Sequence, residues 1–141
     1  MSLNKSVIKE KTLNNFREKF KVLVVEDDDC SFLLLHEILS SHPINIYRAI
    51  NGEEAIANFQ NSKIDYDLVL MDIRLPKVSG YDATQKIKEI NPSIPIIAVS
   101  AYVHSQGIID CFNCGCDDFV AKPIDINGIV SKIENYLVLR N

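Results

Sequence analysis

The sequence of 141 residues has no apolar run long enough to cross a membrane, and its polar N-terminus has no apolar segment of the signal-peptide type. Its five glycines are scattered and form no glycine-rich loop that could cradle the phosphates of a nucleotide. Hydrophobic residues make up 47% of the chain, which is enough for one compact core. We therefore expect a single soluble domain and, without an export signal, a cytoplasmic one.

Positive charge is scarce beyond the first 20 residues. Residues 1–20 carry five Lys and Arg against two Glu, a net charge of +3, whereas the whole chain carries −4, so the remainder carries −7. Contacts to nucleic-acid phosphates need clustered Lys and Arg, so the acidic body argues against nucleic acid as a direct partner. Residues 1–20 show weak helical patterning and are interpreted as a linker or the tail of a preceding helix. The domain is predicted to span residues 21–141.

Three of the four cysteines lie close together in the segment CFNCGC, at Cys111, Cys114 and Cys116. A structural zinc site needs a second pair of ligands at a suitable distance, and here only His104 and the distant Cys30 remain. The segment is therefore interpreted as small, buried, reduced thiols near the end of a helix.

From residue 21 onward, short apolar runs alternate with longer segments of helical periodicity. The predicted strands are 21–26, 44–49, 67–71, 95–100 and 117–121. The predicted helices are 31–39, 52–60, 81–90, 103–112 and 126–137, with Asn51 and Asp125 as N-caps of the second and the last. This alternation predicts an α/β fold, a doubly wound (βα)5 flavodoxin-like domain. Its five parallel strands should have the order 2-1-3-4-5, with helices on both faces.

Two of these helices carry regularly spaced residues, most of them apolar. In the last helix the spaced residues are Ile126, Ile129, Val130, Ile133, Tyr136 and Leu137. In 81–90 they are Tyr81, Thr84, Ile87 and Ile90. Each set predicts the face of a helix that packs on the sheet.

Polar residues follow four of the five strands. They are Glu26, Asp27 and Asp28 at the end of the first, Asp72 after the third, Ser100 at the end of the fourth (followed by Ala101), and Lys122 after the fifth. In the predicted topology these strand ends meet at one edge of the sheet. Crowded carboxylates repel one another, and one lysine cannot neutralise three acids, so a hard divalent cation such as Mg²⁺ would complete the site. Taken singly, each acid also fits a loop residue or a helix cap, and Asp28 or Asp29 is a candidate N-cap.

The segments VLVVEDD, LVLMDIRLPKVSG, IIAVSA and DDFVAKP stand in this order along the chain. With these segments, residues 21 to about 139 resemble the receiver (response-regulator) domain of two-component phosphorelays. The resemblance implies that Asp72 accepts a phosphoryl group. It also implies that Mg²⁺ is bound by Glu26, Asp27, Asp72 and the main-chain carbonyl of Arg74.

The same resemblance assigns roles to four further residues. Lys122, Ser100 and the amide of Ala101 would hold the phosphoryl oxygens, and Ser100 with Phe119 would form the conformational switch. Three residues depart mildly from the common pattern: Glu26 and Ser100 stand where many members have Asp and Thr, and Phe119 stands where many have Tyr. Without a hydroxyl, Phe119 would have to act by packing alone.

The resemblance also implies partners. The phosphoryl donor would be the phosphohistidine of a histidine kinase or a phosphotransfer domain. The surface formed by residues 103–112, residues 117–121 and the last helix would mediate a phosphorylation-dependent dimer. Such a domain catalyses only its own phosphoryl transfer and dephosphorylation. We expect the C-terminal receiver of a hybrid histidine kinase, which would be the cytoplasmic part of a membrane-bound protein, with a stand-alone regulator as the alternative.

Three other classes remain to be weighed against this interpretation. A phosphatase of the haloacid-dehalogenase type wants a second acid two residues after the nucleophile, where this chain has Arg74. A receiver fold that has lost phosphorylation would not be expected to retain the complete set of acids, hydroxyl and lysine. A nucleotide-binding flavodoxin or Rossmann domain would need the phosphate-cradling loop that the scattered glycines do not form.

Overall fold

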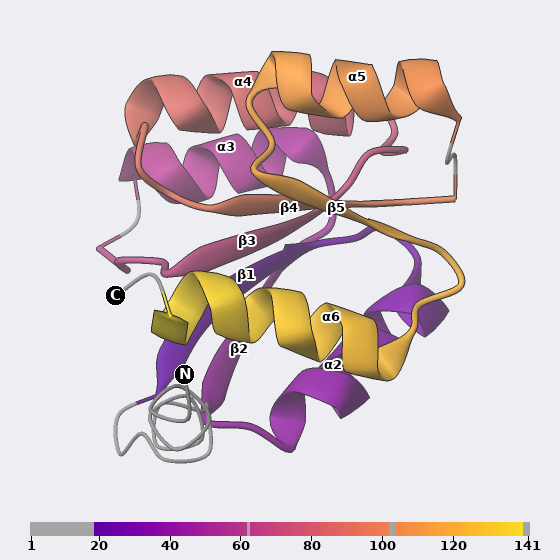
Figure 1. Ribbon diagram of the computed structural model, residues 1–141. Helices are drawn as coiled ribbons and strands as arrows, with labels where there is room; N and C mark the ends of the chain where they lie inside the picture. Colours follow the sequence, from indigo (N-terminus) through magenta and orange to yellow (C-terminus); the bar gives the residue numbers. More distant parts are fainter. Residues whose placement is uncertain (1–18, 62, 102–103, 140–141) are drawn as a thin grey trace.

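A five-stranded parallel sheet forms the centre of the computed structural model, which describes residues 19–61, 63–101 and 104–139 (Figure 1). The strand order is β2-β1-β3-β4-β5. The strands are β1 (Phe20–Val25), β2 (Ile44–Ala49), β3 (Leu68–Asp72), β4 (Ile96–Ser100) and β5 (Asp118–Ala121). The helices are α2 (Asp29–Ser40), α3 (Gly52–Asn61), α4 (Gly80–Ile90), α5 (Ser105–Cys114) and α6 (Ile126–Glu134), followed by a π-helical turn η2 (Asn135–Leu139). The predicted fold class and strand order are confirmed.

The helices cover both faces of the sheet, with α3, α4 and α5 on one side and α2 and α6 on the other (Figure 1). Successive residues of β1 therefore enter two different cores. Val22 and Val24 pack in the cluster that includes the buried residues of α2 and α6, whereas Leu23 and Val25 pack in the cluster of α3, α4 and α5. Burying one aliphatic side chain contributes about 1.5–3 kcal/mol, so a strand that is apolar on both faces is strongly held in the centre of the sheet.

The last helix differs from its prediction at both ends. Ile126, expected on the packed face, is 56% exposed because it is the first residue of α6 and lies outward from the sheet. The regular helix ends at Glu134 and gives way to the π-helical turn. Leu137 and Val138 in this turn are both buried and extend the packed face of α6.

The predicted face of 81–90 is correct only at its centre. Thr84 and Ile87 are fully buried, whereas Ile90 is 42% exposed. A strict three-residue spacing drifts by about 60° per step around an α-helix of 3.6 residues per turn, so three steps carry Ile90 to the opposite side from Tyr81. Ala83, which the spacing did not select, is buried instead.

Side-chain caps fix the starts of the helices beside the carboxyl ends of the strands. Asp28, Asn51 and Asp125 each accept a hydrogen bond from a backbone amide three residues further on, at 2.8, 2.7 and 3.0 Å. The predicted caps are therefore confirmed, and Asp28 rather than Asp29 caps α2. Ser79 and His104 cap α4 and α5 in the same way, which the sequence interpretation did not anticipate.

The segment before the sheet was predicted to be a linker or helix tail. Residues 1–18 of that segment lie outside the described residues, and β1 begins at Phe20, one residue before the predicted start. None of the helices in the described part of the chain is long and apolar enough to cross a membrane.

Candidate functional site

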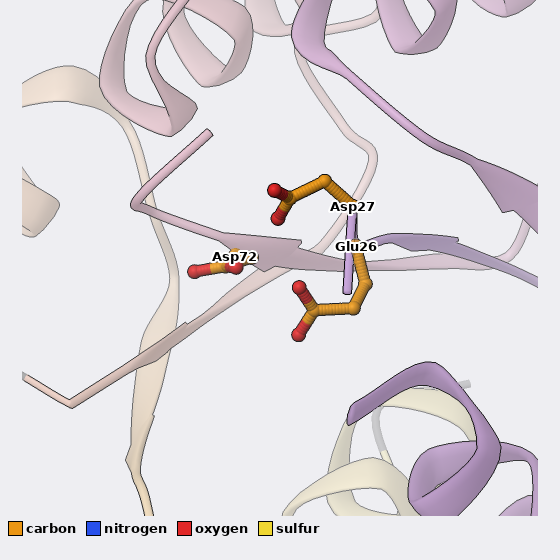
Figure 2. A group of neighbouring side chains, drawn as sticks. All are labelled: Glu26, Asp27 and Asp72. Carbon is orange, nitrogen blue, oxygen red and sulfur yellow. The ribbon is translucent and has the colours of Figure 1, made fainter. Parts of the chain in front are cut away.

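Three carboxylates converge at the carboxyl ends of the two central strands. Glu26 and Asp27 directly follow β1, and Asp72 is the last residue of the neighbouring β3. Their side chains surround one common space (Figure 2). One oxygen from each carboxylate lies within 4.8 Å of the others, and no other such group of potential ligands occurs in residues 19–61, 63–101 and 104–139. The predicted convergence of these acids is therefore present in the structure.

Each oxygen of the two buried acids has its own contact. Asp72 Oδ1 accepts a hydrogen bond from the Arg74 amide at 3.0 Å, and Oδ2 lies 3.7 Å from Lys122 Nζ. Glu26 Oε1 accepts a hydrogen bond from Lys122 Nζ at 3.0 Å, and Oε2 accepts one from the Asp28 amide at 3.3 Å. Lys122 therefore joins the carboxylates of Glu26 and Asp72, while the Asp27 carboxylate stands at the exposed side.

The charges at this edge of the sheet are incompletely balanced. Burial raises the pKa of Glu26 above its ordinary value, and the neighbouring Asp72 carboxylate raises it further, against the opposing effect of Lys122. Burial alone would lower the pKa of Lys122, but its hydrogen bond to Glu26 and the charge of Asp72 outweigh burial, so that this pKa is raised. Glu26 and Asp72 thus share the ammonium group of Lys122, and Asp27 lies beside them.

This donor set fits a hard divalent cation. The three side chains offer only oxygen ligands, which are those that Mg²⁺ prefers. Burial and the neighbouring Asp72 carboxylate both raise the pKa of Glu26, and a bound cation would favour its charged form. The Arg74 amide donates a hydrogen bond to the Asp72 carboxylate, as expected if the chain turns back over this carboxylate after β3. The role of the Arg74 carbonyl as a ligand stays a prediction.

The remaining predicted residues lie on or just after β4, the neighbour of β3, and β5, at the edge of the sheet. Ser100 is the buried last residue of β4, and its carbonyl accepts a hydrogen bond from the Lys122 amide at 2.8 Å. Ala101 follows it and is exposed, and the Lys122–Pro123 peptide bond after β5 is cis. Phe119 is half-buried on β5, and its ring meets that of Phe112 edge to face at a centroid distance of 6.5 Å.

The arrangement of acids, hydroxyl and lysine at these strand ends can be compared with known proteins. Residues 22–134 match the family of the response regulator receiver domain. The chain belongs to this family. Receiver domains are phosphorylatable signalling domains of two-component systems, and the fold and strand order of this chain agree with that membership.

Curated relatives share this domain within longer proteins. The chain is 35% identical over 116 residues to a cyclic di-GMP phosphodiesterase of Thermotoga maritima, covering 82% of this chain and 30% of the relative. It is 33% identical over 122 residues to hybrid signal transduction histidine kinase L of Dictyostelium discoideum, covering 82% of this chain and 7% of that protein. The chain spans half or less of the length of these relatives and of the transcriptional regulatory protein RprY of Bacteroides fragilis.

Solved structures give the same result. In a CheX–CheY complex with BeF₃ and Mg²⁺ from Borrelia burgdorferi, one chain is 30% identical to this receiver domain, with a TM-score of 0.80. The match covers 86% of this chain and 91% of that one. The receiver domain of sensor histidine kinase PA1611 from Pseudomonas aeruginosa, with magnesium in its active-site cleft, is 28% identical with a TM-score of 0.74. That match covers 84% of this chain and 97% of that one.

Two residues of this receiver domain contact the site although the sequence interpretation assigned them no role there; Gly80 entered it only as the last residue of the segment LVLMDIRLPKVSG. Gly80 begins α4, and a Cβ at this position would overlap the carbonyl oxygen of Asp72 and the Cα of Ile73. Arg48, near the end of β2, donates hydrogen bonds to the main chain of Glu26 and Asp27. A glycine at the start of a helix and a basic residue near the end of a strand were the available signals, and neither is specific.

Three of the four cysteines lie around the end of α5, at the opposite end of the sheet from the acidic site of the receiver domain. Cys111 and Cys116 are buried and Cys114 is half-buried around the end of α5, as predicted, whereas Cys30 is exposed. The Cys114 and Cys116 sulfurs are 3.9 Å apart, and Cys116 also lies 3.9 Å from the Thr84 hydroxyl. Burial and the hydrogen bond with Cys114 raise the pKa of Cys116 far above its ordinary value, so this thiol stays protonated.

Proposed function

We propose that this receiver domain accepts a phosphoryl group on Asp72 in a reaction that requires Mg²⁺, and that the phosphoryl group switches its conformation. The donor is the phosphohistidine of a histidine kinase or of a phosphotransfer domain. The observation that carries the proposal is the position of the Asp72 carboxylate, which has an oxygen within 4.8 Å of the carboxylates of Glu26 and Asp27 and lies 3.7 Å from the ammonium group of Lys122. The domain acts as a phosphorylated signal rather than as an enzyme that turns over a substrate.

Asp72 is suited to be the nucleophile because a carboxylate can form an acyl phosphate. An oxygen of Asp72 attacks the phosphorus, the bond between phosphorus and the donor's imidazole nitrogen breaks, and that nitrogen keeps the electron pair. The reaction then depends on in-line positioning and on neutralising the charge of the phosphoryl oxygens. The Arg74 amide orients Asp72 by holding its Oδ1.

Mg²⁺ bound by Glu26, Asp27, Asp72 and the Arg74 carbonyl would neutralise charge on a phosphoryl oxygen. Lys122 is the protein cation of the site, and its 3.7 Å separation from Asp72 leaves it close enough to contact a phosphoryl group there. The Ser100 hydroxyl and the Ala101 amide would hold a further oxygen, because the carboxyl end of β4 lies next to that of β3.

The same contacts provide a route for the signal. A phosphoryl group adds nearly two negative charges and three hydrogen-bond acceptors, toward which Ser100 would move. That movement would make room for Phe119, whose ring already contacts Phe112 on α5. Because Ile109 and Phe112 are about half exposed on this helix, we place the phosphorylation-dependent dimer contact on α5, β5 and α6.

We also propose that residues 21–141 form the receiver unit and that residues 1–20 connect it to another domain, as in a hybrid kinase. Support comes from the hybrid histidine kinase among its relatives. Transfer from a purified phosphorylated phosphotransfer domain would test the donor, and light scattering of the phosphorylated and unphosphorylated chain would test the dimer.

Labelling with acetyl phosphate tests the central proposal. In the presence of Mg²⁺, intact-mass spectrometry should show one added phosphoryl group that hydroxylamine removes, and EDTA should abolish the labelling. Asp72→Asn should abolish it too, whereas Asp67→Asn, at the opposite end of β3, should label like the wild type. An undiminished adduct on the Asp72→Asn variant would place the acceptor elsewhere, and labelling that survives EDTA would contradict the metal requirement.

A further inference from the structure

The guanidinium group of Arg48 contacts the acidic loop through all three of its nitrogens. Nε donates a hydrogen bond to the carbonyl oxygen of Glu26 at 3.1 Å, and Nη2 donates one to that of Asp27 at 3.4 Å. Nη1 forms an ion pair with Asp29 Oδ1 at 2.9 Å. The group also lies over the ring of Phe32, with Cζ 4.5 Å from the ring centroid. Arg48 thus fastens the loop after β1 to strand β2 and helix α2.

These contacts differ in kind from those of Lys122. Lys122 pairs with the carboxylates themselves, whereas Arg48 holds main-chain carbonyls of Glu26 and Asp27 and leaves their carboxylates available. The position of each carboxylate depends on the backbone that carries it, and both acids lie beyond the end of β1, where the regular pairing of the strands ends. The Glu26 amide donates a hydrogen bond to the Ala49 carbonyl, and among the described residues this is the last backbone hydrogen bond between the end of β2 and the segment after β1.

We propose that Arg48 is a positioning residue of the acidic site, and that it holds the main chain of Glu26 and Asp27 in the geometry required for binding the divalent cation. This inference rests on the proposed function. It assigns Arg48 no contact with the cation or with the phosphoryl group. The guanidinium group is a planar and rigid fork, so it can bond the three acceptors around it at fixed positions. A lysine ammonium on its flexible chain cannot hold three acceptors in this geometry.

Charge and positioning predict opposite effects for Arg48. As a mere positive charge near the site, the guanidinium would repel Mg²⁺, so that its removal would tighten binding. As a positioning group it would favour binding, so that its removal would weaken it. The ion pair with Asp29 is a weak explanation for any effect, because the Asp29 side chain is 83% exposed and such pairs contribute little.

The experiment measures Mg²⁺ affinity by titration calorimetry for the wild type, Arg48→Met, Arg48→Lys and Asp29→Asn. Outer contacts of metal ligands typically change affinity by a factor of 10 or more, so we expect Arg48→Met to weaken binding about tenfold. Arg48→Lys keeps the charge but lacks the fork, and should weaken binding about threefold. Asp29→Asn breaks only the exposed ion pair and should stay within about twofold of the wild type.

Two further measurements separate positioning from a general loss of structure. At saturating Mg²⁺ the rate of labelling by acetyl phosphate should recover to within about threefold of the wild type in Arg48→Met, because the defect lies in binding. Thermal unfolding in EDTA shows whether each variant is folded. If Arg48→Met does not fold, the Mg²⁺ affinity of Arg48→Lys tests the inference instead.

Tighter or unchanged Mg²⁺ binding in Arg48→Met, or wild-type binding in Arg48→Lys, would overturn the inference and leave the proposed function standing. A wild-type chain that binds no Mg²⁺ would instead refute the proposed function, and the positioning role with it.

Discussion

Lys122→Met removes the only side-chain cation that contacts the buried acids Glu26 and Asp72 among the described residues, and we expect it to lower the free energy of unfolding. At an effective dielectric constant of about 20, unit charges at these separations attract by about 5 kcal/mol each. The cost of burying the ammonium group offsets most of that attraction, and breaking a buried pair typically costs about 3–5 kcal/mol. Because Lys122 retains 24% exposure and Glu26 can take up a proton, we expect a loss of about 2 kcal/mol.

Urea and thermal unfolding in EDTA measure this loss, which corresponds to about 8 °C in Tm for a domain of this size. Lys132→Met is the matched control, because Lys132 forms an ion pair of similar length with Asp118 but is 39% exposed. The control should lose at most about 1 kcal/mol. Adding Glu26→Gln to Lys122→Met should restore most of the stability, since the uncompensated carboxylate is then gone.

Two results would refute the reasoning about Lys122. One is a loss in Lys122→Met no larger than in Lys132→Met, which would mean that solvent already screens the buried acids. The other is a double variant with Glu26→Gln that stays as unstable as Lys122→Met alone. In that case the lysine would stabilise the domain through the packing of its aliphatic stem and not through its charge.

Three further expectations concern other parts of the domain. Gly80→Ala should cost about 2 kcal/mol in urea unfolding because its Cβ overlaps the backbone at Asp72. Gly128→Ala, whose Cβ would come nearest to the end of the Asp125 side chain and not to backbone, should cost clearly less, and equal losses would contradict the close approach. Hydrogen bonds from Ser31 lower the pKa of Asp28, so its contribution to stability is present at neutral pH and is lost on acidification through that lowered pKa. Asp28→Asn should therefore lose less stability on acidification than the wild type, and parallel pH profiles would count against this role. Replacing Cys111 and Cys114 by Ala should leave metal content and labelling unchanged, whereas stoichiometric zinc in the purified wild type would show that the cysteines bind metal.

The sequence predicted the sheet well because a parallel sheet covered on both faces requires strands that are apolar throughout. The run before Asp72 has this pattern, and an acid at its end is informative because topology brings strand ends together. The convergence of Glu26, Asp27, Asp72 and Lys122 followed from the same rule. These features depend on period and order along the chain, which a sequence displays directly.

The features that escaped prediction depend on contacts between distant residues or on small changes of helix geometry. Arg48 reaches a loop 21 and 22 residues earlier, and its position on β2 only shows that it lies near the end of a strand. The exposure of Ile126 and the π-helical turn after Glu134 depend on how α6 meets the sheet, which apolar spacing alone does not determine. His104 caps α5 with an imidazole nitrogen, an unusual group for that position.

Strand β5 has only four residues and, at the edge of the sheet, pairs with β4 alone. Local opening costs least free energy where few hydrogen bonds must break, so we expect its amides to exchange with solvent faster than those of β1 or β3. Phe119 lies on this strand and Lys122 directly follows it. The residues proposed to sense the phosphoryl group therefore belong to the part of the sheet that yields at the lowest energetic cost, while the strand that carries Asp72 stays fixed between two neighbours.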